Sequence, residues 1–145
     1  MKPAGYSGTP LARKLGIREG SRVVARGAPP EYAAWLDPLP VGAVVVRRAA
    51  RGDRFFHAFV RTMRELEAAC AGLATRFPDD GTLWISWPKR SSGVATALSE
   101  DAVRRAGLGA GLVDIKVCAV SEVWSGLRFA RRLRDRKPRS GSGGR

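Results

Sequence analysis

One segment of the sequence, Trp87–Gly93, combines an indole ring, two cations and two hydroxyl groups directly after an apolar run. Such a ring can stack on a planar group, while the cations can bind phosphate or carboxylate oxygens. A second aromatic and hydroxyl pair, Trp124 and Ser125, follows later in the chain. We interpret these side chains as candidates for binding a planar, anionic ligand; the alternative is that they are core and solvated surface residues. The candidates are Trp87, Lys89, Arg90, Ser91, Ser92, Trp124 and Ser125.

A single histidine, His57, is the one side chain whose ordinary pKa suits a general base near neutral pH. It lies within Arg54–Val60, a continuous aromatic run that is typical of a strand buried on both faces. We therefore favour a hydrogen-bonded core histidine, and keep the catalytic base as the weaker hypothesis. Cys70 and Cys118 do not form a close pair in the sequence. Because a zinc site needs about four clustered ligands, no metal site is predicted.

Strands and helices alternate along the scaffold that must position these side chains. β-Branched and apolar runs predict strands at 22–26, 44–46, 54–60, 82–87, 112–120 and 127–133. Capping residues and helical periodicity predict four helices, at 9–16, 29–39, 62–76 and 99–108. Thr9 is expected to cap the first of them. This alternation predicts a three-layer, Rossmann-like α/β fold with a mainly parallel sheet of about six strands. A C-terminal hairpin is expected to add one antiparallel strand at an edge of that sheet.

The chain is short and strongly basic. Its 145 residues include 26 Lys and Arg against 13 Asp and Glu, which gives a net charge of +13. We expect one domain at 1–133 and a disordered basic tail at 134–145, because the end of the chain lacks apolar residues. Residues 128–145 hold eight basic residues and one acid, which favours binding to nucleic acid; a solubilising tail is the alternative. The nucleic-acid candidates are Arg131, Arg132, Arg134, Arg136, Lys137 and Arg139.

The expected location of the protein rests on hydropathy and cysteine usage. No apolar run approaches the length that spans a membrane, and the first residues lack the apolar stretch of a signal peptide. The two cysteines are expected as free thiols. These features predict a cytoplasmic protein and argue against membrane, secreted and fibrous classes.

Five blocks of the sequence resemble an uncharacterised bacterial family. The blocks are AGYSGTPLARKLGI, LWISWPK, SGVAT, GLVDIKVCAV and WSGL, at 4–17, 83–89, 92–96, 111–120 and 124–127. The family that carries these blocks is named domain of unknown function 3052, and it has no activity to carry over to this chain. More remotely, the order of the elements resembles the class I methyltransferase-like Rossmann fold with one strand and its helix missing.

The turn after the first predicted strand departs from what a Rossmann cofactor site needs. Such a site uses a glycine-rich turn whose backbone approaches phosphate or ribose. Here the turn is Gly27–Glu31, with one glycine and two prolines, and proline lacks the backbone amide. Arg47 and Arg48 replace the acidic residue expected near the end of the second strand. We therefore predict no S-adenosylmethionine or nicotinamide cofactor; the two arginines suit a phosphorylated ligand or a solvated strand end.

The sequence favours a non-catalytic, methyltransferase-like module that binds an anionic partner, either a nucleotide or nucleic acid. The alternative is an enzyme acting on a small phosphorylated or carboxylated substrate at the Trp87–Gly93 loop, with His57 as its base. A third hypothesis is a subunit whose partner supplies the chemistry. Because doubly wound sheets bind ligands beyond the carboxyl ends of their strands, any pocket is expected between this loop and Trp124–Gly126. Clustering of His57, Lys89 and Trp124 around one pocket would favour the enzyme.

Overall fold

The computed structural model describes residues 9–76, 78–94 and 96–132. Within these ranges, six strands form one sheet in the order β2-β1-β3-β4-β6-β5. The strands are β1 (Arg22–Arg26), β2 (Val44–Val46), β3 (Phe55–Phe59), β4 (Thr82–Pro88), β5 (Leu112–Ala119) and β6 (Trp124–Arg131). The helices are α1 (Leu11–Leu15), α2 (Tyr32–Leu36), α3 (Met63–Arg76) and α4 (Glu100–Gly109), with a single 3-10 turn, η1 (Arg90–Ser92).

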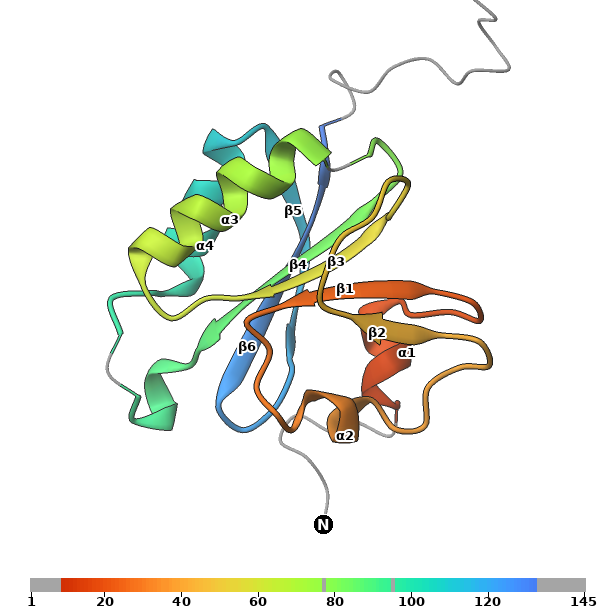
Figure 1. Cartoon of the computed structure of the whole chain (residues 1–145). Helices are drawn as coiled ribbons and strands as arrows, with labels where there is room; N and C mark the ends of the chain where they lie inside the picture. Colours follow the sequence, from red (N-terminus) through yellow and green to blue (C-terminus); the bar gives the residue numbers. More distant parts are fainter. Residues whose placement is uncertain (1–8, 77, 95, 133–145) are drawn as a thin grey trace, which may run out of the picture.

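Helices cover both faces of the sheet (Figure 1). In α3, Leu66 and Leu73 lie on one helical face and pack with Val103 of α4 against one side of the strands. On the other side, Leu15 of α1 and Leu36 of α2 belong to a second apolar cluster. The predicted three-layer α/β fold with about six strands is therefore confirmed.

The parallel part of the sheet contains a reversal in strand order. β1 pairs in parallel with both β2 and β3, and β3 pairs in parallel with β4. The chain thus adds β2 on one side of β1 and then returns to add β3 on the other side. All of β3 is buried, as predicted for a strand covered on both faces. In sheets of this kind, the crevice outside the carboxyl ends of the strands at such a reversal is the usual ligand site.

The C-terminal hairpin forms as predicted, but the expectation that its antiparallel strand lies at an edge is wrong. β6 begins at Trp124 and pairs antiparallel with both β4 and β5, so β5 forms the edge instead. Leu127 and Phe129 of β6 are at most 1% exposed, whereas Ile115 and Val117 of β5 are 51% and 48% exposed. The physical reason is that β6 pairs on both of its edges and is covered there, whereas β5 pairs only with β6 and leaves the side chains at its centre exposed.

The two short helices, α1 and α2, also differ from the prediction at their boundaries. Pro10 is the N-cap of α1 and makes no side-chain cap, so Thr9 does not cap this helix. α2 begins at Tyr32 rather than at 29, with Glu31 as its N-cap. It ends at Leu36 rather than Leu39, because Asp37 takes the extended conformation that a following proline favours.

Candidate functional site

The loop predicted to bind a ligand leaves the sheet at the carboxyl end of β4 and forms η1. The backbone amide of Lys89 donates a 2.7 Å hydrogen bond to the carbonyl of Val123, which ties this loop to the β5–β6 hairpin. Ser92 Oγ donates to the Lys89 carbonyl at 2.6 Å, whereas Arg90 and Ser91 are exposed. The structure therefore brings the predicted loop and the predicted hairpin side by side.

The two tryptophans of the predicted site lie in opposite core layers. Trp87 packs in the cluster beneath α3 and α4, and Trp124 packs in the cluster beneath α1 and α2. Their exposed fractions are 4% and 7%. Trp87 is paired with the half-buried Ser125, and side chains alternate between the faces of a strand, so Trp124 points to the other side. In this packing the two rings do not face each other across one ligand, and binding by Lys89 and Arg90 stays a prediction.

His57 is enclosed in the core, with only 1% of its surface exposed. Its Nδ1 lies 2.7 Å from the hydroxyl of Tyr32, and its Nε2 lies 2.7 Å from Oγ of Ser86. A neutral imidazole donates from one nitrogen and accepts at the other, so both ring nitrogens are satisfied. Burial lowers the pKa of His57 to about 3, which keeps the ring neutral. His57 thus joins α2, β3 and β4 in a polar core network whose other members, Tyr32 and Ser86, the sequence analysis did not identify.

Arg61 follows β3 and contacts the turn after β1 and the first residue of β6, next to the β1–β3 reversal. Its Nη2 donates to the carbonyl of Gly27 at 3.0 Å, and its guanidinium lies over the ring of Trp124, 4.9 Å from the ring centre. Gly27 has a φ of +68°, and a β-carbon there would lie 2.7 Å from the carbonyl oxygen of Phe59. The ends of β1 and β3 are therefore in close contact, and glycine is required at this position. Sequence reasoning missed Arg61, although its place just after the buried aromatic run was a usable signal.

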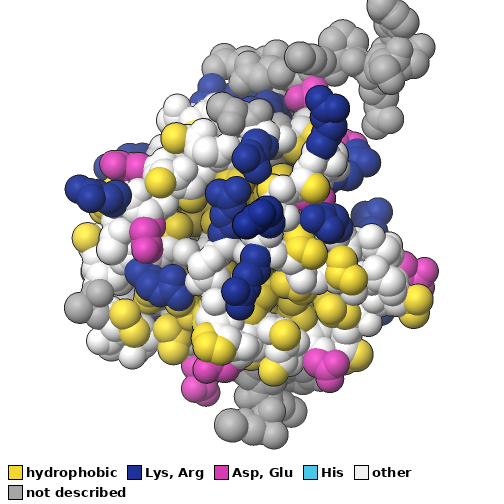
Figure 2. Space-filling model, viewed as in Figure 1, with side chains coloured by type: hydrophobic (Ala, Val, Ile, Leu, Met, Phe, Trp, Pro, Cys, Tyr) yellow, Lys and Arg dark blue, Asp and Glu magenta, His cyan; other side chains and the backbone are white. Residues whose placement is uncertain are grey.

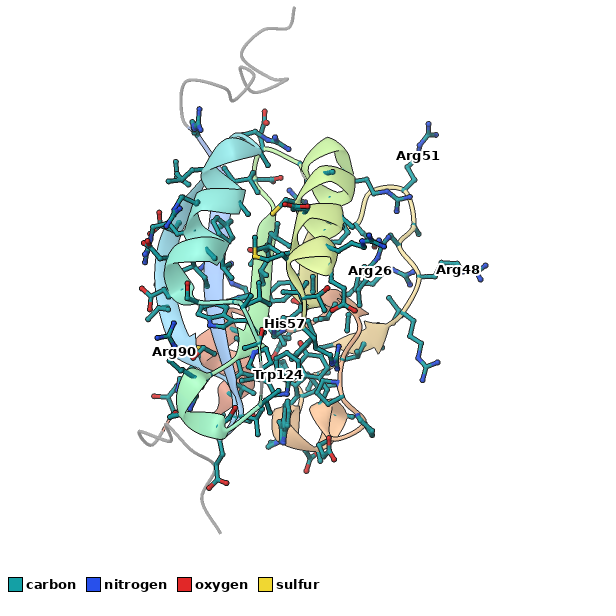
Figure 3. All side chains as sticks on the ribbon, turned by 90° about the vertical axis from the view of Figure 1, so that its left-hand side faces the viewer. Arg26, Arg48, Arg51, His57, Arg90 and Trp124 are labelled. Atoms are coloured by element: carbon teal, nitrogen blue, oxygen red, sulfur yellow. The ribbon has the colours of Figure 1, made fainter. Side chains whose placement is uncertain are left out.

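Exposed arginines gather on the face of the molecule that carries β1 and β2 (Figure 2). Arg26, Arg48 and Arg51 all point toward this face (Figure 3). Arg22 shares one side of β1 with Arg26; its side chain is 44% exposed, and its partner in β2, Val44, is 48% exposed. Between these two arginines, Val24 is buried in the cluster beneath α3 and α4. We name Arg22, Arg26, Arg48 and Arg51 the arginine face.

The predicted nucleic-acid residues are only partly within the described ranges. Arg131 ends β6, and its Nε lies 3.8 Å from a carboxylate oxygen of Asp79. The side chain of Arg132 donates to the carbonyl of Leu108. The remaining candidates, together with the predicted tail at 134–145, lie outside the described residues: Arg134, Arg136, Lys137 and Arg139.

Cysteine and metal chemistry receive little support from the described residues. Both cysteines are free thiols, and burial raises the pKa of Cys70 to about 11 and also raises the pKa of Cys118. Within the described ranges, no group of three or more His, Cys, Asp or Glu residues could hold a metal ion.

Among the helices described, none has the length and apolar character needed to cross a membrane.

Solved structures resemble this chain over most of its length. A putative type 11 methyltransferase from Sulfolobus solfataricus aligns with a TM-score of 0.57 and 11% identity, over 88% of this chain and 93% of that protein. Fibrillarin from Aeropyrum pernix, with natively bound S-adenosyl-L-methionine, aligns with a TM-score of 0.51 and 12% identity, over 83% of this chain and 73% of fibrillarin. The chain has a methyltransferase-like Rossmann fold.

The likeness extends to larger proteins, and it concerns the fold alone. A LepI variant in complex with SAH and a substrate analogue aligns with a TM-score of 0.53 and 12% identity, over 91% of this chain. The chain spans only about half of that protein, namely 49% of its length. No family model and no curated protein matches the chain. Membership in the domain of unknown function 3052 family therefore stays a prediction.

Proposed function

We propose that this methyltransferase-like chain is a non-catalytic module that binds nucleic acid through its arginine face. The observation that carries the proposal is the set of exposed side chains on β1 and β2. Arg22 and Val44 are paired across these strands and both are exposed, so the surface between them is open to a partner. Arg26 and Arg48 extend the same surface (Figure 3).

The chemistry of this surface suits an extended polyanion. Guanidinium groups form paired hydrogen bonds with phosphate, and each neutralised phosphate releases counterions from nucleic acid. Arg26 and Arg48 make no ion pair with a described carboxylate, so their charge is available. Arg26 ends β1 and Arg48 follows the neighbouring parallel strand β2, and both are exposed. Two separate exposed cations suit the successive phosphates of a backbone better than a single nucleotide.

The non-catalytic part of the proposal is supported by the turn after β1, at the β1–β3 reversal. A Rossmann cofactor would use the backbone amides of the turn after β1, and Pro29 and Pro30 offer none. In the same turn, Arg61 donates a hydrogen bond to the carbonyl of Gly27, and its guanidinium lies over the ring of Trp124. These residues do not fit S-adenosylmethionine or a nicotinamide cofactor. The enclosure of His57, the candidate base, also favours binding over catalysis.

The test is the salt dependence of binding to a labelled DNA duplex of random sequence, measured by fluorescence anisotropy. The Arg26→Ala, Arg48→Ala double variant should bind more weakly, and the slope of log K against log salt should fall by about two. The matched control is Arg13→Ala with Arg64→Ala, which removes two exposed arginines on α1 and α3. Equal losses in both double variants would mean that net charge alone drives binding, and would overturn the assignment to the arginine face.

A further inference from the structure

A cavity of about 620 Å³ lies at the amino ends of the parallel strands, at the opposite edge of the sheet from the usual ligand crevice. Its walls come from the first residues of three strands, Arg22 of β1, Phe55 of β3 and Thr82 of β4. Loop residues between α1 and β1 and between β2 and β3 complete the rim. This volume falls within the range of small-molecule sites.

Arginine dominates the lining of this amino-edge cavity. Five arginines and two aspartates line it, which leaves a net charge of +3. Arg22 is neutralised by Asp53 at 2.8 Å, and Arg54 forms an ion pair with Asp80. The other three have no carboxylate partner among the described residues: Arg18, Arg51 and Arg128.

Arg128 is the informative member of the three. It lies in β6 opposite Trp84 of β4, and its Nη2 donates to Oγ1 of Thr82 at 3.3 Å. Its Nε is buried and has no hydrogen-bond partner in the described part of the molecule. Buried, unpaired donors are rare in native proteins, because desolvation without a partner costs about 1–3 kcal/mol, and more for charged groups. A ligand oxygen in the cavity would supply the missing acceptor.

We propose that this cavity binds the phosphate group of a small, polar phosphate ester, such as a sugar phosphate. A guanidinium matches two phosphate oxygens at once, and Arg18 adds a second cation without a carboxylate. Ser21 and Thr82 contribute hydroxyl groups, while Phe55 is the one aromatic residue in the lining. The polar walls therefore suit a hydroxylated ligand body better than a purine or other large apolar ring. Arg22 and Arg51 belong both to this lining and to the arginine face, but the proposal rests on Arg18 and Arg128, which lie outside that face.

The experiment is a calorimetric titration of the full chain with inorganic pyrophosphate and with ribose phosphate, with sodium chloride held constant. Saturable binding of both probes is expected, and Arg128→Met should weaken it about ten- to a hundredfold through loss of a charge-assisted contact. Met retains most of the aliphatic length of the side chain, so the variant is expected to fold. Arg18→Ala, at an exposed position, is a second variant that should weaken binding without touching the core.

The matched control is Arg64→Ala, an exposed arginine in the first turn of α3, which follows the carboxyl end of β3. It should bind both probes as the unchanged chain does. Loss of binding in Arg64→Ala with normal binding in Arg128→Met would place the anion site away from the amino-edge cavity and overturn the proposal. Absence of saturable binding by the unchanged chain would also overturn it. DNA binding by Arg128→Met should be unchanged, so failure here is distinguishable from failure of the arginine face.

Discussion

Gly107 of α4 lies directly against the ring of Phe129 in β6: a β-carbon at Gly107 would lie 2.1 Å from the nearest ring atom. Phe129 is fully buried, so its ring has no free space to enter. This contact sets how closely α4 approaches the sheet, and only glycine allows it.

Gly107→Ala should lower the free energy of unfolding by about 3 kcal/mol, because overpacking a filled core forces shifts in the ring or the helix. The control is Gly109→Ala in the same helix, where a β-carbon would meet nothing within 4 Å. That variant should keep the stability or raise it by up to about 1 kcal/mol, through higher helix propensity. Urea unfolding monitored by circular dichroism measures both. Equal stability of the two variants would contradict the close packing of α4 on β6.

His57 should make stability fall in mild acid. The pKa of His57 is lowered from 6.5 to about 3 in the folded chain. Between these two pH values the histidine is protonated in the unfolded chain and neutral in the folded chain. This contribution to stability is therefore present above pH 6.5 and is lost as the pH falls toward 3. The free energy of unfolding should be about 2 kcal/mol smaller at about pH 5 than at about pH 8 from this group alone.

The comparison for His57 is His57→Gln, whose amide can still bond to Tyr32 and Ser86 but does not titrate. Denaturant melts across this pH range should show a shallower decline in the variant. If both chains lose stability in parallel, the decline comes from other groups and His57 is not the neutral, buried histidine described here.

S-Adenosylmethionine should not bind at low micromolar concentration, because Pro29 and Pro30 lack backbone N–H groups and Arg61 donates to the carbonyl of Gly27 in the same turn. Isothermal titration calorimetry is the direct measurement. Fibrillarin from Aeropyrum pernix, which holds this cofactor natively, is a suitable positive control. A dissociation constant near 1 μM, equivalent to about −8 kcal/mol, would contradict the prediction.

A chain ended at Leu133 should bind duplex DNA less tightly than the full chain. The shortening removes five basic residues and one acid. Up to about four or five phosphate contacts should be lost. The slope of log K against log salt should therefore become less steep by about the same number. A slope that does not change would show that the sequence after Leu133 makes no phosphate contacts.

Periodicity and turn chemistry determined the secondary structure of this protein. The β-branched run at Arg22–Arg26 and the aromatic run around His57 became strands close to their predicted bounds, because each run is long enough to bury a strand and is bounded by turn residues. Ser99 caps α4 by accepting from the amide of Ala102, a local interaction that the sequence alone specifies. The alternation of these elements was sufficient for the fold class.

The tertiary structure alone decided which residues meet. The placement of β6 between β4 and β5 put Trp87 and Trp124 on opposite faces, because pairing register fixes the direction of every side chain in a strand. The contact of Arg61 with Gly27 and the unpaired Nε of Arg128 join residues far apart in the chain. A local sequence pattern reflects interactions between residues that are close in the chain. Contacts between residues far apart in the chain are set only when the strands pair and the helices pack on them.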